Sequence, residues 1–152
     1  MARDYAIHDT AMPIDRPRIG SALVGFAPFT YALMRVGTGL LFMEHGLQKL
    51  FGMFGGFGGT PGATAPLASQ MGLAGVIELG GGIMLALGLL TRPVALVMAI
   101  EMIVAFVQAH LPHGGWPIEN HGELPLLYAL VFLFFFGHGG GPASLDRTLS
   151  RR

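Results

Sequence analysis

Four long apolar runs, joined by short polar segments, are the feature that most constrains how this chain can fold. We place the runs at residues 29–51, 72–90, 94–111 and 123–136. A helix of about 20 apolar residues crosses the hydrocarbon core of a bilayer. Charged residues make up only 12% of the chain, whereas soluble domains carry about 25%. The runs therefore predict an all-α fold, an integral membrane four-helix bundle, in preference to a soluble helical bundle with a large core.

The distribution of polar residues divides the chain into three parts. Residues 1–27 form a polar arm with a short interfacial segment before Pro28, residues 28–147 form the helical domain, and residues 148–152 form a tail. The arm scatters its charges and has no short apolar stretch ending in a cleavage site, as a signal peptide would. We therefore expect the first apolar run to be retained as a spanning helix.

Arginine placement predicts the orientation. Three arginines precede the first run, one lies in the turn between the second and third runs, and three follow the fourth run. A four-span topology puts all of them on one side, which is the cytoplasmic side because Lys and Arg are enriched in cytoplasmic loops. We expect a multi-pass protein of the bacterial inner membrane with both termini cytoplasmic and the other two loops facing outward.

Composition excludes several kinds of function. The formal net charge is zero, so nothing in the composition indicates a nucleic-acid partner. The chain contains no cysteine, which removes thiol chemistry, Cys-ligated zinc and iron–sulfur ligation by this chain.

Ionisable residues inside the apolar runs are the main functional signal, because each costs about 2.5–3.5 kcal/mol to insert into a membrane. Counting depth at about 1.5 Å per residue places Arg35 and Glu101 at similar heights and predicts an ion pair between them. The same count brings His45, Lys49 and Glu78 together in the outer half of the bundle. The candidates for binding a ligand or relaying protons are Arg35, His45, Lys49, Glu78, Glu101 and Glu123.

Each of these groups also has a structural interpretation. A buried Arg–Glu pair can fix helix register without taking part in chemistry, and for Arg35 and Glu101 we leave both interpretations open. An off-centre cluster that opens to one side is typical of a ligand or proton site, so for His45, Lys49 and Glu78 we favour function. Glu44 falls on the opposite face of the helix from Arg35 and would meet another helix, another subunit or lipid headgroups.

The loop after the third run carries weak candidates for a metal site. His110, His113 and His121 lie near Glu119 and Glu123, and imidazole and carboxylate groups can hold transition metals. Their spacing is loose, and an interfacial polar loop with Trp116 at headgroup level explains it equally well. No flavin, nicotinamide or nucleotide-phosphate motif is present.

Three stretches together resemble the DoxX family of small bacterial membrane proteins. They run from Arg35 to Gly52, from Glu78 to Pro93, and from Asn120 to Asp146. The resemblance implies a four-helix membrane bundle in a redox context with quinone nearby. It places Arg35, His45, Lys49, Glu78, Arg92 and Glu123 at motif positions, whereas Glu44 is not part of the pattern.

These observations lead to three hypotheses. In the first, the chain is a membrane subunit linked to quinone metabolism, which need not itself be catalytic. Its buried polar cluster binds a quinone-like ligand or relays protons, while a redox partner protein supplies the electron carrier. In the second, the chain is a small-molecule or proton-coupled transporter that acts as a homo-oligomer. In the third, it is a non-catalytic scaffold for partner proteins in the lipid bilayer.

Overall fold

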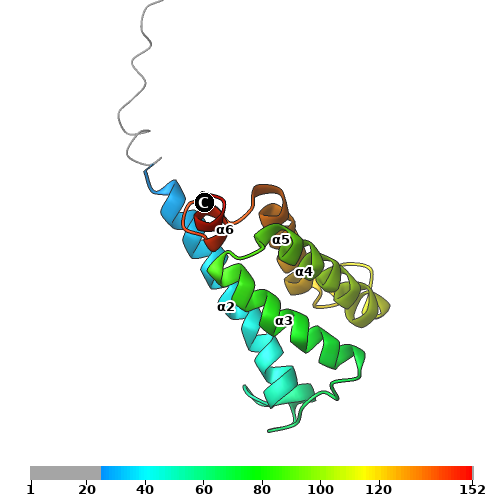
Figure 1. Ribbon diagram of the computed structural model, residues 1–152. Coiled ribbons are helices and arrows are strands. Elements are labelled where there is room, and N and C mark those ends of the chain that lie inside the picture. Colours follow the sequence, from blue (N-terminus) through cyan, green and yellow to red (C-terminus); the bar gives the residue numbers. More distant parts are fainter. Residues whose placement is uncertain (1–24, 152) are drawn as a thin grey trace, which may run out of the picture.

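The computed structural model describes residues 25–151, and in this range the chain contains helices and loops but no β-strand. Figure 1 shows the long helices lying side by side, with a short helix near the C-terminus. The predicted all-α class is therefore confirmed. The helices are α2 (Ala27–Phe51), α3 (Gln70–Leu87), α4 (Thr91–Ala105), α5 (Glu123–His138) and α6 (Leu145–Leu149). The interfacial segment predicted before Pro28 falls largely outside the described residues.

Two of the helices in the described range are long and apolar enough to cross a membrane by length and composition. They are α3 and the continuous helical stretch Thr91–His113, which begins with α4. Helix α2 has 25 residues, but Arg35, Glu44 and Lys49 interrupt its apolar surface. Helix α5 is apolar and shorter, with 16 residues.

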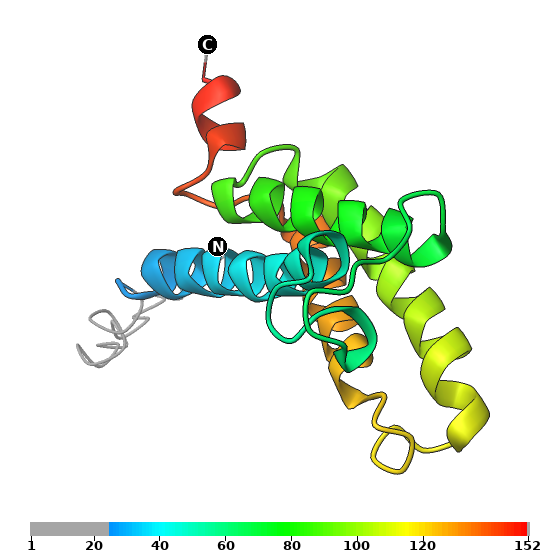
Figure 2. The ribbon, with the colours of Figure 1, turned by 90° about the horizontal axis from the view of Figure 1, so that it is seen from below.

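The bundle consists of two helix pairs. Helix α3 packs closely along α2, and α5 packs along α4. Glycine makes the first contact possible, because a Cβ on Gly46 would lie 2.5 Å from the backbone nitrogen of Leu79, and a Cβ on Gly82 would lie 2.6 Å from the carbonyl oxygen of Gly39. In Figure 2, α4 and α5 diverge from the α2–α3 pair toward the loop that joins them. This end of the bundle is called the loop end below.

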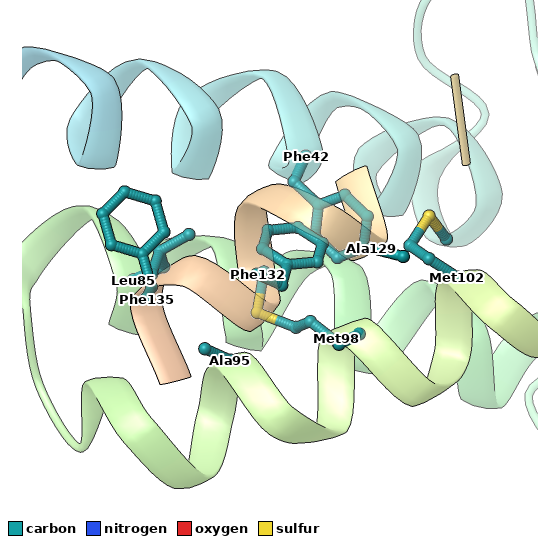
Figure 3. Packing of buried hydrophobic residues seen from close by; sticks show 9 residues of the cluster. Phe42, Leu85, Ala95, Met98, Met102, Ala129, Phe132 and Phe135 are labelled. Atoms are coloured by element: carbon teal, nitrogen blue, oxygen red, sulfur yellow. The ribbon is translucent and has the colours of Figure 1, made fainter. Parts of the chain in front are cut away.

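A hydrophobic core fills the space between the two pairs (Figure 3). The ring of Phe42 on α2 packs against Phe132 on α5, with centroids 4.7 Å apart. Met98 on α4 reaches toward α3, where a Cβ on Gly81 would lie 2.8 Å from its sulfur. Large side chains therefore join the pairs in the middle of the bundle, and the packing loosens toward the loop end.

The C-terminal segment is fastened to the turn between α3 and α4. The Asp146 carboxylate accepts hydrogen bonds from the backbone nitrogens of Leu90 at 2.7 Å and Thr91 at 2.9 Å. The Asp146 nitrogen donates to the carbonyl of Gly88 at 2.9 Å. A carboxylate at this position caps the N-terminus of α4 and neutralises its unpaired N–H groups. The sequence did not predict α6 or this cap.

The cap predicts a dependence of stability on pH. Burial alone would raise the pKa of Asp146, but the hydrogen bonds with Thr91 and Leu90 and the charge of Arg35 hold it below the ordinary value of 3.8. Because the folded-state pKa is depressed, this stabilisation is present above pH 3.8 and is lost as the pH falls through the folded-state value. The protection of the Leu90 and Thr91 amides against hydrogen exchange, relative to the intrinsic rate at each pH, should therefore fall as the pH drops below 3.8. In Asp146→Asn this protection should already be low at neutral pH and change little with acidification, and unchanged protection in that variant would contradict the assignment.

Candidate functional site

An ion pair between α2 and α3 stands at the centre of the candidate site. Lys49 Nζ lies 2.5 Å from Oε1 and 2.7 Å from Oε2 of Glu78, and Glu78 is only 3% exposed. The glycine one turn before Glu78 provides room for the lysine, because a Cβ on Gly75 would lie 3.0 Å from Lys49 Cβ. The structure thus brings together two residues of the predicted outer cluster.

A cavity of about 580 Å³ lies between α3 and α4 on one side of this pair. Its walls are apolar, and rim residues such as Leu73 and Ile100 are more than half exposed on the outside of the bundle. The polar groups that reach this α3–α4 cavity are Lys49, Glu78, Glu101, Gln70 and Gln108. A largely apolar pocket with a few convergent polar groups is the usual form of a small-molecule site.

Glu101 adds a second carboxylate to the α3–α4 cavity. Its Oε2 atom is buried and has no hydrogen-bond partner among residues 25–151. A buried polar atom without a partner is costly and is found where a ligand, water or proton completes the site. Near the cavity rim, Gln70 donates a short hydrogen bond to Gln108 and connects α3 to the helical segment Phe106–His110 that follows α4.

A second, inner cavity of about 210 Å³ lies on the other side of the ion pair. Lys49, Glu78, Met102 and Ala105 line both cavities. Only the inner cavity is lined by the following polar or aromatic residues: Phe42, His45, His110, His121 and Tyr128. The ion pair therefore forms part of the wall between an apolar cavity and one rich in titratable side chains.

A π-helical turn at Phe106–His110 shapes the wall between the cavities. Gln108 and Ala109 line the α3–α4 cavity, whereas the next residue, His110, lines the inner cavity. The His110 ring is held by a contact of 2.9 Å between Nδ1 and the carbonyl oxygen of Asn120. Such turns are rare and recur at functional sites.

Sequence reasoning missed both the π-helical turn and Asn120, which is 4% exposed. The side chain of Asn120 organises the loop, because its Nδ2 donates to Gly114 at 2.7 Å and its Oδ1 accepts from Gly122 at 2.8 Å. Asn120 begins the third stretch that resembles the DoxX family and lies between Gly114 and Gly122, and these were the signals that the sequence offered.

The predicted ion pair between Arg35 and Glu101 is wrong. The buried Arg35 guanidinium instead donates to the carbonyl oxygens of Leu85 at 2.7 Å, Ala86 at 2.6 Å and Ala143. The depth count assumed that the helices begin at one level, but α2 begins so far out that Arg35 meets the C-terminal end of α3. Arg35 therefore binds the carbonyls that a helix end leaves unpaired, and Glu101 lies nearer the loop end.

Of the other predicted site residues, His45 lines the inner cavity together with Lys49 and Glu78, whereas Glu123 lies in the first turn of α5 and lines neither cavity. Glu44, which was not a candidate, is exposed on α2 and also lines neither cavity. Between residues 25 and 151, no three or more His, Asp or Glu side chains are grouped so that they could hold a metal ion. His110 and His121 line the inner cavity, whereas His113 is exposed and does not.

Comparison with known proteins assigns the family. The sequence profile of the DoxX family matches residues 30–111, a range that contains Arg35, the Lys49–Glu78 pair and Glu101. The chain belongs to the DoxX family.

Three relatives extend the match beyond this range. A Haemophilus influenzae protein without an assigned activity is 35% identical over 130 residues, which cover 84% of this DoxX chain and 96% of the relative. A Mycobacterium tuberculosis protein named as a membrane protein is 32% identical over 142 residues, which cover 82% of this chain and 84% of the relative. The Bacillus subtilis protein CatD is 38% identical over 119 residues, which cover 75% of this chain and 82% of the relative. The name of CatD gives oxidoreductase as a provisional assignment.

No solved structure matches the DoxX chain significantly. The family and the two long apolar helices together indicate a membrane location.

Proposed function

We propose that this DoxX protein is a multi-pass subunit of the bacterial inner membrane that binds a quinone-like ligand in the α3–α4 cavity. In this proposal α2, α3, α4 and α5 span the bilayer, and both termini are cytoplasmic, as the arginine distribution predicts. The observation that carries the proposal is the position of Lys49, Glu78 and Glu101 at an apolar cavity whose rim lies on the outside of the bundle.

The shape of the cavity suits a ligand that arrives through the lipid. Leu73, Val97 and Ile100 line the cavity and are about half exposed, so in a bilayer they would contact acyl chains. A volume of about 580 Å³ lies within the range of about 300–1,000 Å³ that is usual for small-molecule sites. An isoprenoid tail would remain among the lipids while the headgroup enters.

The polar groups suit a carbonyl-bearing headgroup. Lys49 can donate to a quinone oxygen, and Glu101 has a buried oxygen without a partner that can exchange a proton with the same ligand. Reduction of a quinone takes up protons together with electrons. In this proposal the electrons come from a partner protein that carries a flavin or metal centre, and the DoxX chain binds the ligand and handles its protons. The provisional name of CatD is consistent with this redox context.

Binding of a short-chain ubiquinone or menaquinone analogue to detergent-purified protein tests the proposal. We expect Lys49→Met to weaken binding of the oxidised analogue, whose carbonyl oxygens accept from Lys49, and Glu101→Gln to weaken binding of the reduced analogue, whose hydroxyls donate to the carboxylate. Each change should cost roughly 10- to 100-fold, since a hydrogen bond to a charged group contributes about 1.5–3 kcal/mol. Ala74→Phe should also weaken binding, because Ala74 lines the cavity and a phenyl ring would occupy part of its volume. Isothermal titration calorimetry gives the affinities.

Glu44→Gln is the matched control, because it removes the same charge from a residue that lines neither cavity. It should bind the analogue like the wild type. If the wild type binds no analogue at millimolar concentration, the quinone proposal fails and the scaffold interpretation becomes the better one. If Glu44→Gln weakens binding as much as Glu101→Gln, the ligand site has been placed on the wrong face.

A further inference from the structure

We infer that the inner cavity is a water-filled passage through which the ligand site exchanges protons with the loop end of the molecule, and not with the opposite end, where α2 begins and α6 lies, which is called the terminus side below. This inference rests on the proposed function for its purpose, and it adds the route and the side of the membrane. The geometry that carries it is the shared wall, in which Lys49 and Glu78 face both cavities.

The first step is the position of the ion pair. A group that lines two cavities can interact with a ligand in one and with water in the other. Glu78 and its ion-pair partner Lys49 are such groups, because both side chains line the α3–α4 cavity and the inner cavity. A proton that reaches Glu78 from the inner cavity is therefore one side chain away from a ligand in the α3–α4 cavity.

The second step is the chemistry of the inner cavity. Its lining includes His45 on α2, Tyr128 on α5, and His110 and His121 at the loop end. His45 packs edge-on against Tyr128, with ring centroids 6.1 Å apart. Imidazole and phenol groups can both donate and accept hydrogen bonds, and a volume of about 210 Å³ is enough for several water molecules.

The third step is the direction in which the cavity leads. His121 is exposed and Leu124 is 50% exposed, so the lining reaches the surface at the loop end. Toward the opposite end, Phe42, Phe132 and Phe135 are fully buried and close the bundle. The passage therefore opens on one side, which is the outer face in the orientation that the arginines predict.

The absence of cysteine from the chain allows a direct test with single cysteines in oriented proteoliposomes. A thiol reacts with charged methanethiosulfonate reagents as the thiolate, which needs water around it. We expect His45→Cys, on the lining of the inner cavity, to react with the membrane-impermeant trimethylammonium-ethyl reagent added on the loop side. It should react within about tenfold of the rate of His121→Cys, and not when reagent is added on the terminus side.

Two further variants make the test decisive. Ala105→Cys is a small change on the lining of the same cavity, and it serves if His45→Cys does not fold. Leu130→Cys is the control, because Leu130 on α5 is 65% exposed and lines neither cavity. In the bilayer it should react with membrane-permeant N-ethylmaleimide at most.

Each outcome has a defined meaning. Reaction of His45→Cys and Ala105→Cys from the loop side alone supports the passage. Reaction from the terminus side, reaction with N-ethylmaleimide only, or no reaction with either reagent overturns it. These results do not depend on ligand binding, so a working quinone site with an unreactive His45→Cys would retain the proposed function and remove this inference. If the cysteines are labelled from the loop side but the protein binds no analogue, the passage is supported and the proposed function fails.

Discussion

Glu78→Leu should lower the free energy of unfolding in detergent by about 3–5 kcal/mol, because removal of one partner leaves the other charge of a buried pair uncompensated. Glu78 is 3% exposed and its only hydrogen-bond partner in the described range is Lys49. The loss can be measured by thermal or SDS-induced unfolding monitored by circular dichroism.

The double variant Lys49→Met with Glu78→Leu separates structure from function. Replacing both members of a buried pair by apolar residues of similar size is often neutral or stabilising, so this variant should recover most of the stability. It should nevertheless fail to bind the quinone analogue. If the double variant were stable and bound the analogue normally, the pair would serve packing alone, and if Glu78→Leu cost less than about 1 kcal/mol, the pair would be hydrated as a surface pair is.

Gly46→Ala should destabilise the protein by about 3 kcal/mol, at the upper end of the usual cost of overpacking. The new methyl group would lie 2.5 Å from the nitrogen of Leu79 and 2.7 Å from the carbonyl oxygen of Gly75. Both are backbone atoms that cannot rotate away, so α2 and α3 must separate. The same unfolding assay measures the effect.

Gly37→Ala is the control on the same helix, because nothing lies within 4 Å of the position that its new methyl group would take. It should be neutral or should stabilise α2 by up to about 1 kcal/mol, the difference in helix propensity between glycine and alanine. Equal effects at the two positions would show that the close α2–α3 contact does not determine the change in stability at Gly46.

Periodicity and length predicted the helices well and their ends less well. The first and fourth runs agree with α2 and α5 to within two residues. The second run was extended to residue 90, but α3 ends at Leu87 because Gly88 adopts a left-handed conformation with φ of 67°. Helix α4 begins earlier than predicted, at Thr91, with Pro93 in its first turn.

Sequence reasoning predicted the contact between two charged side chains, Lys49 and Glu78. It missed the features of the candidate site that depend on backbone atoms and on backbone geometry. The heights of Lys49 and Glu78 followed from residue counts along two helices. The partners of Arg35 are carbonyl oxygens, which every residue has, so no sequence pattern marks them. The π-helical turn accommodates one additional residue in the helix, which no sequence pattern marks. The α3–α4 cavity depends on how the two helix pairs diverge, and counting residues along each helix does not show their divergence.

The attachment of the C-terminal segment to Arg35 and to the α3–α4 turn has a consequence for biogenesis. Ala143 and Asp146 are synthesised after α2, α3, α4 and α5, yet they complete contacts of α2 and of the turn between α3 and α4. A truncated product would therefore hold an arginine with a lost acceptor near the membrane and an uncapped α4. Such a product would be less stable and more exposed to proteolysis than a chain that extends past Asp146, because α2 and α4 would lack these contacts.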